Sequence, residues 1–377
     1  MRRKRVTFLL NSLADGGAER VMATLLAQSR EECEEFDVSL VLLDRAREDY
    51  RIPDWVSTHQ LDCRGSVWQS VRQVSKLIAE QRPDVTLSFL TRANVANVWA
   101  MRGRRCVISA RINTSAHLAA KPNAALGAAV RLSYPRASKI VAVSEDVGKD
   151  LSVNFGVDPA RIVSIPNPVD VAAIARMARE APPIVIGGPY IVAVGRLYGI
   201  KNFPLLLRAV AHAGLPHKVL ILGEGPDREL LMSLATAVGL EGRVILPGRL
   251  ANPFPLIAGA DAFALSSNGE GFPNALVEAM ALGVPVVAAD CPSGPSEIVA
   301  GTARGLIGTA TLASHGVLTP PNDISEFAAA LSLVVRQDVR ERLSRAGAER
   351  ALQYEPAGIK NRYWSVLREH LDERVRS

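Results

Sequence analysis

The sequence has few cysteines and no long uncharged apolar stretch, and each shortage excludes a class of protein. The four cysteines lie 30, 43 and 185 positions apart, which fits neither zinc-ligand spacing nor a disulfide framework; they are Cys33, Cys63, Cys106 and Cys291. No apolar run reaches the roughly 18 residues that a membrane-spanning helix needs, and the first residues lack the layout of a signal peptide. We therefore expect a cytoplasmic protein with reduced cysteines and no metal.

Aromatic residues are also sparse, at 5% of the chain, and no recognised nucleic-acid-binding motif is present. Because base stacking needs exposed aromatic rings, this composition disfavours a nucleic-acid-binding protein. What the chain does have is length and apolar content. Its 377 residues, 48% of them hydrophobic, allow two or three domains at about 150 residues each.

Positive charge is unevenly distributed along the chain. The net charge of +6 lies wholly in residues 1–168, which hold 24 Lys and Arg against 18 Asp and Glu, while residues 169–377 hold 20 of each. Within Arg64–Lys139 the net charge is +11. Such a segment attracts phosphates, whether of anionic lipid headgroups, nucleic acid or a pyrophosphate-linked substrate. The alternative is a solvated face that only keeps the protein soluble.

Short apolar runs alternate with helix-period segments in both halves, which is typical of parallel sheets covered on both faces. The expected strands are Val6–Leu10, Val38–Leu43, Val85–Leu90, Cys106–Ala110 and Ile140–Ser144, then Tyr190–Val194, Val219–Leu222, Val244–Leu246, Ala262–Leu265 and Val284–Ala288. The expected helices are Ala18–Arg30, Val67–Gln81, Val147–Phe155, Phe203–Ala213, Arg228–Val238, Asn274–Leu282 and Ile359–Leu371.

Proline and glycine mark a connection between the halves, at Ile165-Pro166-Asn167-Pro168 and then at Pro182-Pro183 and Gly187-Gly188-Pro189. We therefore predict an α/β fold with two doubly wound, Rossmann-like domains, residues 1–168 and 169–355. A final helical segment, 356–377, could return to the N-terminal domain. Ligands of such sheets bind at the carboxyl ends of the strands, so a cleft between facing domains is the expected site.

Two glycine-containing turns follow expected strands and could hold an anion. Gly16-Gly17 lies where the first helix should begin, so its backbone amides could approach a phosphate, although a plain tight turn explains the pair equally well. In Gly195–Asn202, Arg196 and Lys201 supply two cations at the end of a strand, as a pyrophosphate would need. A solvated loop with incidental basic residues is the alternative there.

The strongest motif covers Ser266–Met280. Gly271 to Asn274 should form a loop that opens a helix, whose free amides can bind an anionic or hydroxyl-rich ligand. Glu270 lies in that loop, and Glu278 falls within an apolar stripe of the helix. A carboxylate among apolar residues is costly unless it is hydrogen-bonded, and ribose hydroxyls are suitable donors. The alternative for Glu278 is a modest interaction with the helix dipole.

These motifs resemble family 4 of the retaining, nucleotide-sugar-dependent glycosyltransferases, which have the two-domain GT-B fold. The similarity runs over nearly the whole chain and is densest from Gly195 to Ile298. It rests on short stretches that are specific together; they are Gly16–Arg20, Ala142–Val147, Ile165–Asp170, Gly195–Asn202, Gly223–Leu231, Glu270–Ala288 and Cys291–Ile298. The resemblance implies a facing pair of Rossmann-like domains with the nucleotide on the second and the acceptor on the first.

The resemblance also implies residue roles. Glu270 would contact the donor sugar, Glu278 would hold the ribose hydroxyls, and Arg196 with Lys201 would neutralise the departing diphosphate. The remaining donor-binding residues would act through backbone groups or close approach, and Glu297 would lie in the helix turn on the phosphate side; that donor-binding set is Gly16, Gly17, Gly195, Gly223, Glu224, Gly271, Phe272, Pro273 and Asn274.

One position departs from many relatives, which carry a histidine just after the fourth strand of the first domain. Arg111 occupies the equivalent place here, with Asn113 and the offset His117 nearby, and we take these three as acceptor-side candidates.

The reaction implied is transfer of a sugar, with retention, from a nucleoside-diphosphate sugar, expected to be a UDP-sugar. The acceptor is expected to be a glycan or glycolipid, with a polyprenyl-pyrophosphate-linked glycan as the sharper hypothesis because the basic segment lies on the acceptor side. Peripheral docking on the anionic inner face of the plasma membrane would follow. A nucleotide-sugar epimerase of the same architecture is the alternative. We expect no cofactor, no metal and no nucleic-acid partner.

Overall fold

The computed structural model describes residues 2–14, 16–46, 48–120, 122–305 and 307–372. It divides into two compact units. The first unit combines the residues up to Pro168 with those from Pro356 onward, and the second runs from Val169 to Glu355. The chain therefore crosses between the units twice, and its last helix belongs to the first of them.

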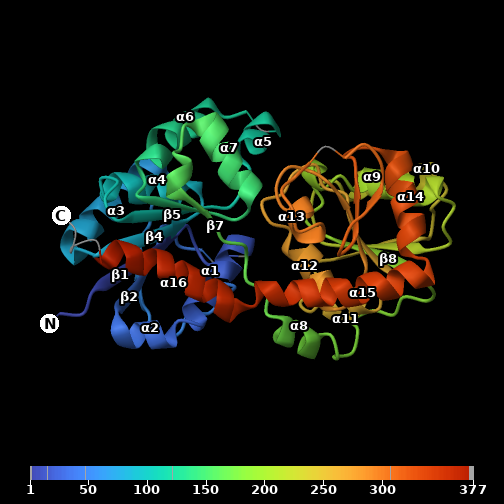
Figure 1. The fold of residues 1–377 in the computed structure, drawn as a ribbon, viewed down its shortest axis with the longest axis horizontal. Coiled ribbons are helices and arrows are strands. Elements are labelled where there is room, and N and C mark those ends of the chain that lie inside the picture. Colours follow the sequence, from blue (N-terminus) through green and yellow to red (C-terminus); the bar gives the residue numbers. More distant parts are fainter. Residues whose placement is uncertain (1, 15, 47, 121, 306, 373–377) are drawn as a thin grey trace. The chain divides into compact units, whose positions relative to one another are not determined.

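The first unit contains a seven-stranded parallel sheet with the order β3-β2-β1-β4-β5-β6-β7 (Figure 1). Its strands are β1 (Arg5–Leu10), β2 (Asp37–Leu42), β3 (Ser57–Gln60), β4 (Val85–Phe89), β5 (Cys106–Ala110), β6 (Lys139–Ala142) and β7 (Ile162–Ser164). The helices are α1 (Gly17–Ala27), α2 (Arg30–Glu35), α3 (Val67–Gln81), α4 (Thr91–Ala100), α5 (Thr114–Ala120), α6 (Ala124–Ser133), α7 (Glu145–Phe155) and α16 (Pro356–Asp372), with short 3₁₀ turns η1 (Tyr134–Arg136) and η2 (Pro159–Arg161).

Helix α16 closes one face of this sheet. The indole of Trp364 is fully buried, stacks on the ring of Phe36 with 5.5 Å between centroids, and donates a hydrogen bond to Ser29 Oγ at 2.8 Å. A buried ion pair of 2.9 Å joins Lys360 to Glu32. Because aromatic side chains bury the most apolar surface of any residue type, Trp364 anchors the far end of the chain to the first unit.

The second unit repeats the plan with the strand order β10-β9-β8-β11-β12-β14-β13, parallel except for β13, which pairs antiparallel with β14. Its strands are β8 (Tyr190–Val194), β9 (Lys218–Leu222), β10 (Val244–Gly248), β11 (Ala262–Leu265), β12 (Val286–Ala289), β13 (Thr311–Leu312) and β14 (Val317–Thr319). The helices are α8 (Val171–Met177), α9 (Phe203–His212), α10 (Arg228–Ala237), α11 (Phe254–Ala258), α12 (Asn274–Ala281), α13 (Pro295–Val299), α14 (Ile324–Val334) and α15 (Gln337–Ala351), with 3₁₀ turns η3 (Gly199–Lys201) and η4 (Leu352–Tyr354).

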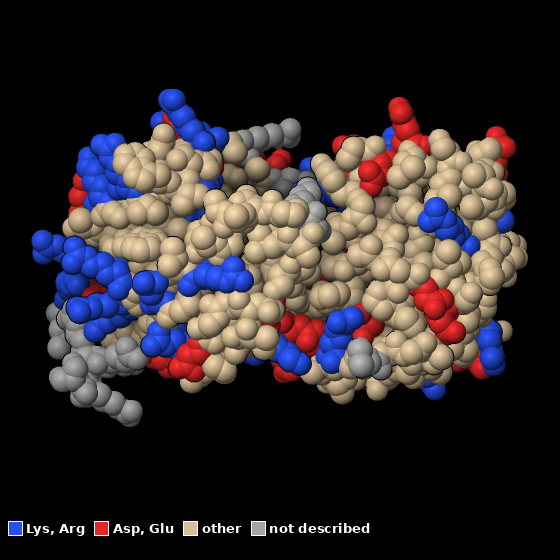
Figure 2. Space-filling model, turned by 90° about the horizontal axis from the view of Figure 1, so that it is seen from above, with Lys and Arg blue, Asp and Glu red and all other residues tan. Residues whose placement is uncertain are grey.

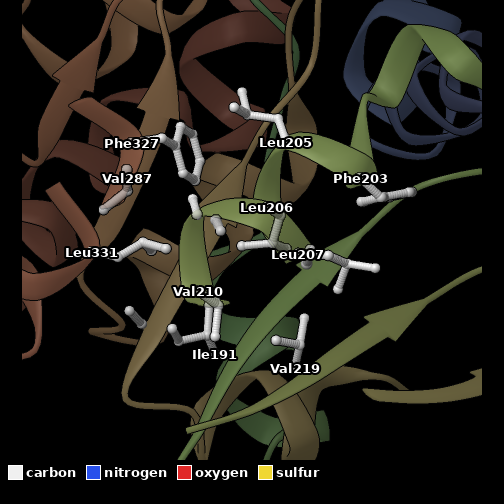
Figure 3. Close-up of a cluster of buried hydrophobic side chains, with 14 of the residues drawn as sticks. Ile191, Phe203, Leu205, Leu206, Leu207, Val210, Val219, Val287, Phe327 and Leu331 are labelled. Atoms are coloured by element: carbon white, nitrogen blue, oxygen red, sulfur yellow. The ribbon is translucent and has the colours of Figure 1, made fainter. Parts of the chain in front are cut away.

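The core of the second unit lies between α9, α14 and the sheet (Figure 3). Leu206 and Val210 of α9 are fully buried against Ile191 and Val219 of the strands beneath them. Apolar side chains on α9 at three- and four-residue spacing face the sheet, as an amphipathic helix requires. This packing buries β8 in the core, and the loop that follows β8 carries the site described next.

The predicted α/β class and both parallel sheets are confirmed. Each predicted strand is present within two residues of its expected ends, and each predicted helix within three. The prediction omitted short strands and helices in both units. The omitted strands are β3, β7, β13 and β14, and the omitted helices are α2, α4, α5 and α6 in the first unit and α8, α11, α13, α14 and α15 in the second.

Candidate active site

The second sheet has a topological switch point at β8. This strand pairs with β9 on one side and with β11 on the other, so the connections leave in opposite directions. In open parallel sheets, ligands bind beside the carboxyl ends of the strands at such a point. The loops that follow β8 and β11 are residues 195–202 and 266–273, which hold two of the strongest sequence motifs.

An ion pair joins these two loops. Lys201 Nζ donates to Glu270 Oε1 at 2.6 Å, and Ser267 Oγ donates to the same oxygen at 2.6 Å. Both charged side chains are largely buried, with 23% of Lys201 and 10% of Glu270 exposed. A Cβ at Gly195 would lie 3.2 Å from the aliphatic stem of Lys201, so glycine leaves the lysine its path toward Glu270. The structure thus brings together two predicted site residues that lie 69 positions apart.

Backbone contacts hold the two loops in register. The amide of Asn268 donates to the carbonyl of Ile200 at 2.8 Å, and Ser266 Oγ donates to the carbonyl of Lys201 at 2.9 Å. Asn202, in the left-handed region at φ 47°, bridges from its side-chain amide to Asn322 Oδ1 at 2.8 Å. Because these bonds are made by the protein's own groups, they fix the position of Lys201 at the end of β8.

The second predicted cation lies differently. Arg196 is exposed, and its guanidinium carbon lies 5.6 Å from the centre of the Tyr198 ring. The structure therefore pairs Lys201 with Glu270 and leaves the Arg196 side chain in solvent, on the same loop. An exposed guanidinium is available for a diphosphate, for which its planar fork is suited.

Helix α12 begins directly after the loop that carries Glu270. Pro273 occupies the cap position and makes no capping hydrogen bond from its side chain. Glu278 is 7% exposed, between the buried Val277 and Ala279. The predicted burial of this carboxylate is confirmed, while its contact with ribose hydroxyls stays a prediction. Phe272, by contrast, packs its ring against Tyr354 at 5.3 Å between centroids, so only its backbone is left for a ligand.

Close contact with the neighbouring backbone explains why glycines occupy the loop after β9. Gly223 has φ 146°, and a Cβ there would lie 2.0 Å from the carbonyl oxygen of Gly195. Gly225 has φ 157°, and its Cβ would lie 2.4 Å from the carbonyl oxygen of Leu197. Leu197 N also donates to Glu224 O at 2.8 Å. This loop therefore presses against the loop that carries Arg196 and supports it, whether or not Gly223 and Glu224 touch a donor.

In the first unit, Arg111 follows β5 and is fixed by uncharged groups. Its guanidinium lies 4.8 Å from the centre of the Phe89 ring, donates to Tyr363 Oη at 3.3 Å, and also donates to Asn167 Oδ1. Burial lowers the pKa of Arg111 from its ordinary value, while Tyr363 and Glu19 oppose this shift. Arg111 therefore links β5 to α16 and to the connection that leaves the unit.

The other acceptor-side candidates do not join Arg111 in the contacts that the structure records. Asn113 Oδ1 accepts the amide of Ala116 at 2.9 Å and so caps α5, whereas His117 is exposed in the last turn of that helix. Gly16 is the cap residue of α1, and a Cβ there would lie 2.1 Å from Glu19 Oε2, which shows that Glu19 folds back over this turn.

Sequence reasoning missed Ser267 and Cys291 as neighbours of the ion pair. Burial raises the pKa of the Cys291 thiol well above its ordinary value, Glu270 raises it further, and Lys201 lowers it. Ser267 precedes Glu270 by three residues directly after an apolar strand, a spacing that could have identified it. All four cysteines are free thiols.

Within 2–372, apart from the positions not described, no group of three or more His, Cys, Asp and Glu residues could hold a metal ion. No helix among those same residues is both long and apolar enough to cross a bilayer.

Both halves of the chain match known protein families. Residues 15–173 match the family model described as Glycosyltransferase Family 4, and residues 188–337 match the one described as Glycosyl transferases group 1. A similar curated protein is the Campylobacter jejuni N-acetylgalactosamine-N,N'-diacetylbacillosaminyl-diphospho-undecaprenol 4-alpha-N-acetylgalactosaminyltransferase, 30% identical over 81% of this chain and 86% of that protein.

Solved structures show the same fold. HepE from Anabaena, in complex with UDP, superposes with a TM-score of 0.74 at 21% identity over 97% of this chain and 100% of its own. Sucrose-phosphate synthase from Thermosynechococcus elongatus superposes with a TM-score of 0.78 at 16% identity over 97% of this chain and 99% of its own.

Proposed function

The chain belongs to the family 4 glycosyltransferases, and from this premise we propose that it moves a sugar, with retention, from a UDP-sugar to a hydroxyl of a polyprenyl-diphosphate-linked glycan. The observation that carries the donor half of this proposal is the Lys201–Glu270 pair at the switch point of the second sheet. Nothing in the comparisons favours the epimerase alternative, because the similar proteins are transferases.

The leaving group determines what the site must supply. When the bond between the anomeric carbon and the diphosphate oxygen breaks, negative charge grows on the diphosphate, and positioned cations stabilise it. We assign this task to Lys201, already held at the end of β8, and to the exposed Arg196. The first turn of α12 adds backbone amides that can bind the same anion. These groups are the reason to expect transfer without a divalent cation.

The two carboxylates, Glu270 and Glu278, would bind the hydroxyl groups of the donor. Glu270 lies beside Lys201 in the loop and would accept hydrogen bonds from the sugar hydroxyls. Glu278, buried one turn inside α12, would accept hydrogen bonds from the ribose. The Gly16-Gly17 turn and the acceptor-side residues Arg111, Asn113 and His117 stay predictions for the first unit.

The acceptor proposal rests on charge and on relatives. The segment Arg64–Lys139 carries a net charge of +11. The Campylobacter relative acts, by its name, on a diphospho-undecaprenol-linked sugar. The lipid of such an acceptor would place the reaction at an anionic membrane, expected to be the inner face of the plasma membrane, and that charge would suit the membrane surface.

Two variants test the donor assignment. Glu278→Ala should weaken UDP binding by about 10- to 100-fold, the cost of losing hydrogen bonds to a charged group. Glu270→Ala should leave UDP affinity nearly unchanged and reduce turnover, because it contacts the sugar. Calorimetry with UDP and transfer assays with radiolabelled UDP-sugars measure these two effects.

Glu229→Ala is the matched control, because Glu229 is exposed on α10 of the same unit. Glu278→Gln keeps the shape of the buried side chain and separates lost binding from misfolding. UDP affinity unchanged in both Glu278 variants would contradict the ribose assignment.

A further inference from the structure

Basic side chains gather where strands β4 to β7 begin. We call this group the basic edge and define it by seven residues that precede or start these strands, namely Arg82, Arg102, Arg104, Arg105, Arg136, Lys139 and Arg161. The exposed acidic residues closest to them in the chain are Glu80 and Asp158. Figure 2 shows Lys and Arg crowded at the left end of the first unit, the side from which its strands begin in Figure 1.

Direct contacts make the basic edge one surface. A Cβ at Gly103 would lie 2.3 Å from the carbonyl oxygen of Arg136, so the turn after α4 packs on η1. Arg161 donates to the carbonyl of Pro135 at 3.0 Å, and Lys139 Nζ donates to the carbonyl of Ala160 at 3.3 Å. The starts of β5, β6 and β7 are therefore tied together beneath these cations.

Three of the arginines occupy backbone positions that favour another residue. Arg82, Arg102 and Arg105 have φ values of 50°, 54° and 50°, in the left-handed region where glycine and asparagine are preferred. Arg82 ends α3, and the other two shape the turn after α4. A side chain kept there at a conformational cost indicates that the charge itself is used.

Exposed apolar side chains accompany the charge. Trp99 and Leu132 are 47% and 53% exposed, and the Arg136 guanidinium lies 5.7 Å from the centre of the Trp99 ring. Val153, near the end of α7, is 71% exposed. Tryptophan and long basic side chains together are typical of protein surfaces at the headgroup level of a bilayer. Duplex nucleic acid or an acidic protein would call for the charge but not for the exposed aliphatic side chains Leu132 and Val153.

We propose that the basic edge docks on an anionic lipid bilayer, with Trp99 and Leu132 at headgroup level and the arginines on lipid phosphates. The inference does not rest on the acceptor assignment of the proposed function, because the edge lies at the opposite ends of the strands from the carboxyl edge at which ligands of such sheets bind.

Because Arg82, Arg102 and Arg105 have left-handed backbone conformations, their charge can be removed by a substitution that adds no backbone strain. In Arg82→Asn/Arg102→Asn/Arg105→Asn, asparagine suits the backbone, so stability should not fall. At about 1 kcal/mol for each basic residue near the surface, three lost charges predict partition into phosphatidylglycerol-containing vesicles about a hundredfold weaker. The unmodified chain should float with these vesicles at low salt and not with pure phosphatidylcholine.

The matched control removes three exposed arginines from helices of the second unit, as Arg208→Gln/Arg342→Gln/Arg345→Gln. It should float like the unmodified chain. Equal loss in both triple variants, equal recovery with both lipids, or binding to duplex DNA but to no vesicle would overturn the proposal. UDP affinity should be the same in the unmodified chain and in both triple variants. If the unmodified chain did not bind UDP, that result would count against the proposed function and not against membrane docking.

A second readout locates the contact. Brominated lipids should quench the fluorescence of vesicle-bound protein, and Trp99→Phe should remove most of that quenching. Trp68→Phe should not, although Trp68 is 69% exposed, because it lies at the start of α3, away from the basic edge. Quenching lost with Trp68 rather than Trp99 would place the bilayer on another face and refute the assignment.

Discussion

Both units carry a basic side chain just after a strand of a parallel sheet, but its surroundings differ. Lys201 in the second unit meets a carboxylate, Glu270, that arrives from the loop of the neighbouring strand β11. Arg111 in the first unit meets an aromatic ring, a phenol and an amide oxygen. The hydrogen-bond partner of Lys201 carries the opposite charge, whereas the hydrogen-bond and ring partners of Arg111 are neutral.

We expect this difference to separate a chemical role for Lys201 from a structural role for Arg111. A lysine paired with a carboxylate can exchange that partner for a diphosphate, since the incoming anion supplies the same kind of contact. Arg111 stacks on Phe89 and bonds to Tyr363 and Asn167, three residues that lie far apart in the chain. We therefore expect the loss of Arg111 to lower the stability of the first unit more than it changes the affinity for nucleotide.

The largest expected effect is on stability and concerns α16, the helix from the far end of the chain that packs on the first unit. Trp364→Ala should lower the free energy of unfolding of the first unit by about 3–5 kcal/mol, the usual cost of emptying a buried aromatic site. Urea denaturation followed by hydrogen exchange in each unit measures it. Trp68→Ala, at an exposed tryptophan, should change it by less than about 0.5 kcal/mol. Equal losses in the two variants would refute the anchoring role of α16.

A smaller effect, on rate, should follow at the charged pair. Lys201→Ala should reduce kcat/KM by about 10²-fold, as expected for one donor to a developing charge. Lys218→Ala removes the same charge from the start of β9, at the amino edge of the same sheet, and should leave the rate unchanged. Steady-state transfer assays compare the two. A normal rate in Lys201→Ala would mean that the Lys201–Glu270 ion pair is structural, so that Lys201 and Arg111 would not differ in role.

The smallest effect should come from Arg111→Ala. Losing the ring contact and two hydrogen bonds should destabilise the first unit by about 1–2 kcal/mol while UDP affinity stays constant. Arg111→Lys restores the charge without the planar stack and should recover only part of that stability. Thermal denaturation and UDP calorimetry on both variants decide the matter. A fall in UDP affinity would show that Arg111 acts beyond its own unit.

A helix with a clear apolar period was predictable from the sequence, and a helix without one was not. Helix α3 has apolar residues at helical spacing, and its predicted bounds, Val67–Gln81, match the structure. Helix α4 was missed because it lacks a polar face to set against an apolar one. Its Asn94 and Asn97 are fully buried, where they bond to Ser88 and Thr86 of β4. Such polar residues resemble a loop when the sequence is read alone.

The candidate site was predictable residue by residue but not as an arrangement. Lys201, Glu270 and Glu278 were each identified from their own short motif. The ion pair was not predictable, because its partners are brought together only by the pairing of β8 with β11. Gly223 was assigned to donor binding from its motif, and only the backbone of Gly195–Leu197, which lies against Gly223 and Gly225, shows the structural purpose of these two glycines.

The sequence by itself determined the class of fold, the two-sheet plan and the chemical types available to the site, because hydrophobic period and local motifs act over a few residues. The tertiary structure alone decided which cation meets which carboxylate, which arginine is locked in place, and that scattered arginines form one basic edge. Those outcomes depend on strand order, which places residues far apart in the chain within hydrogen-bonding distance of one another.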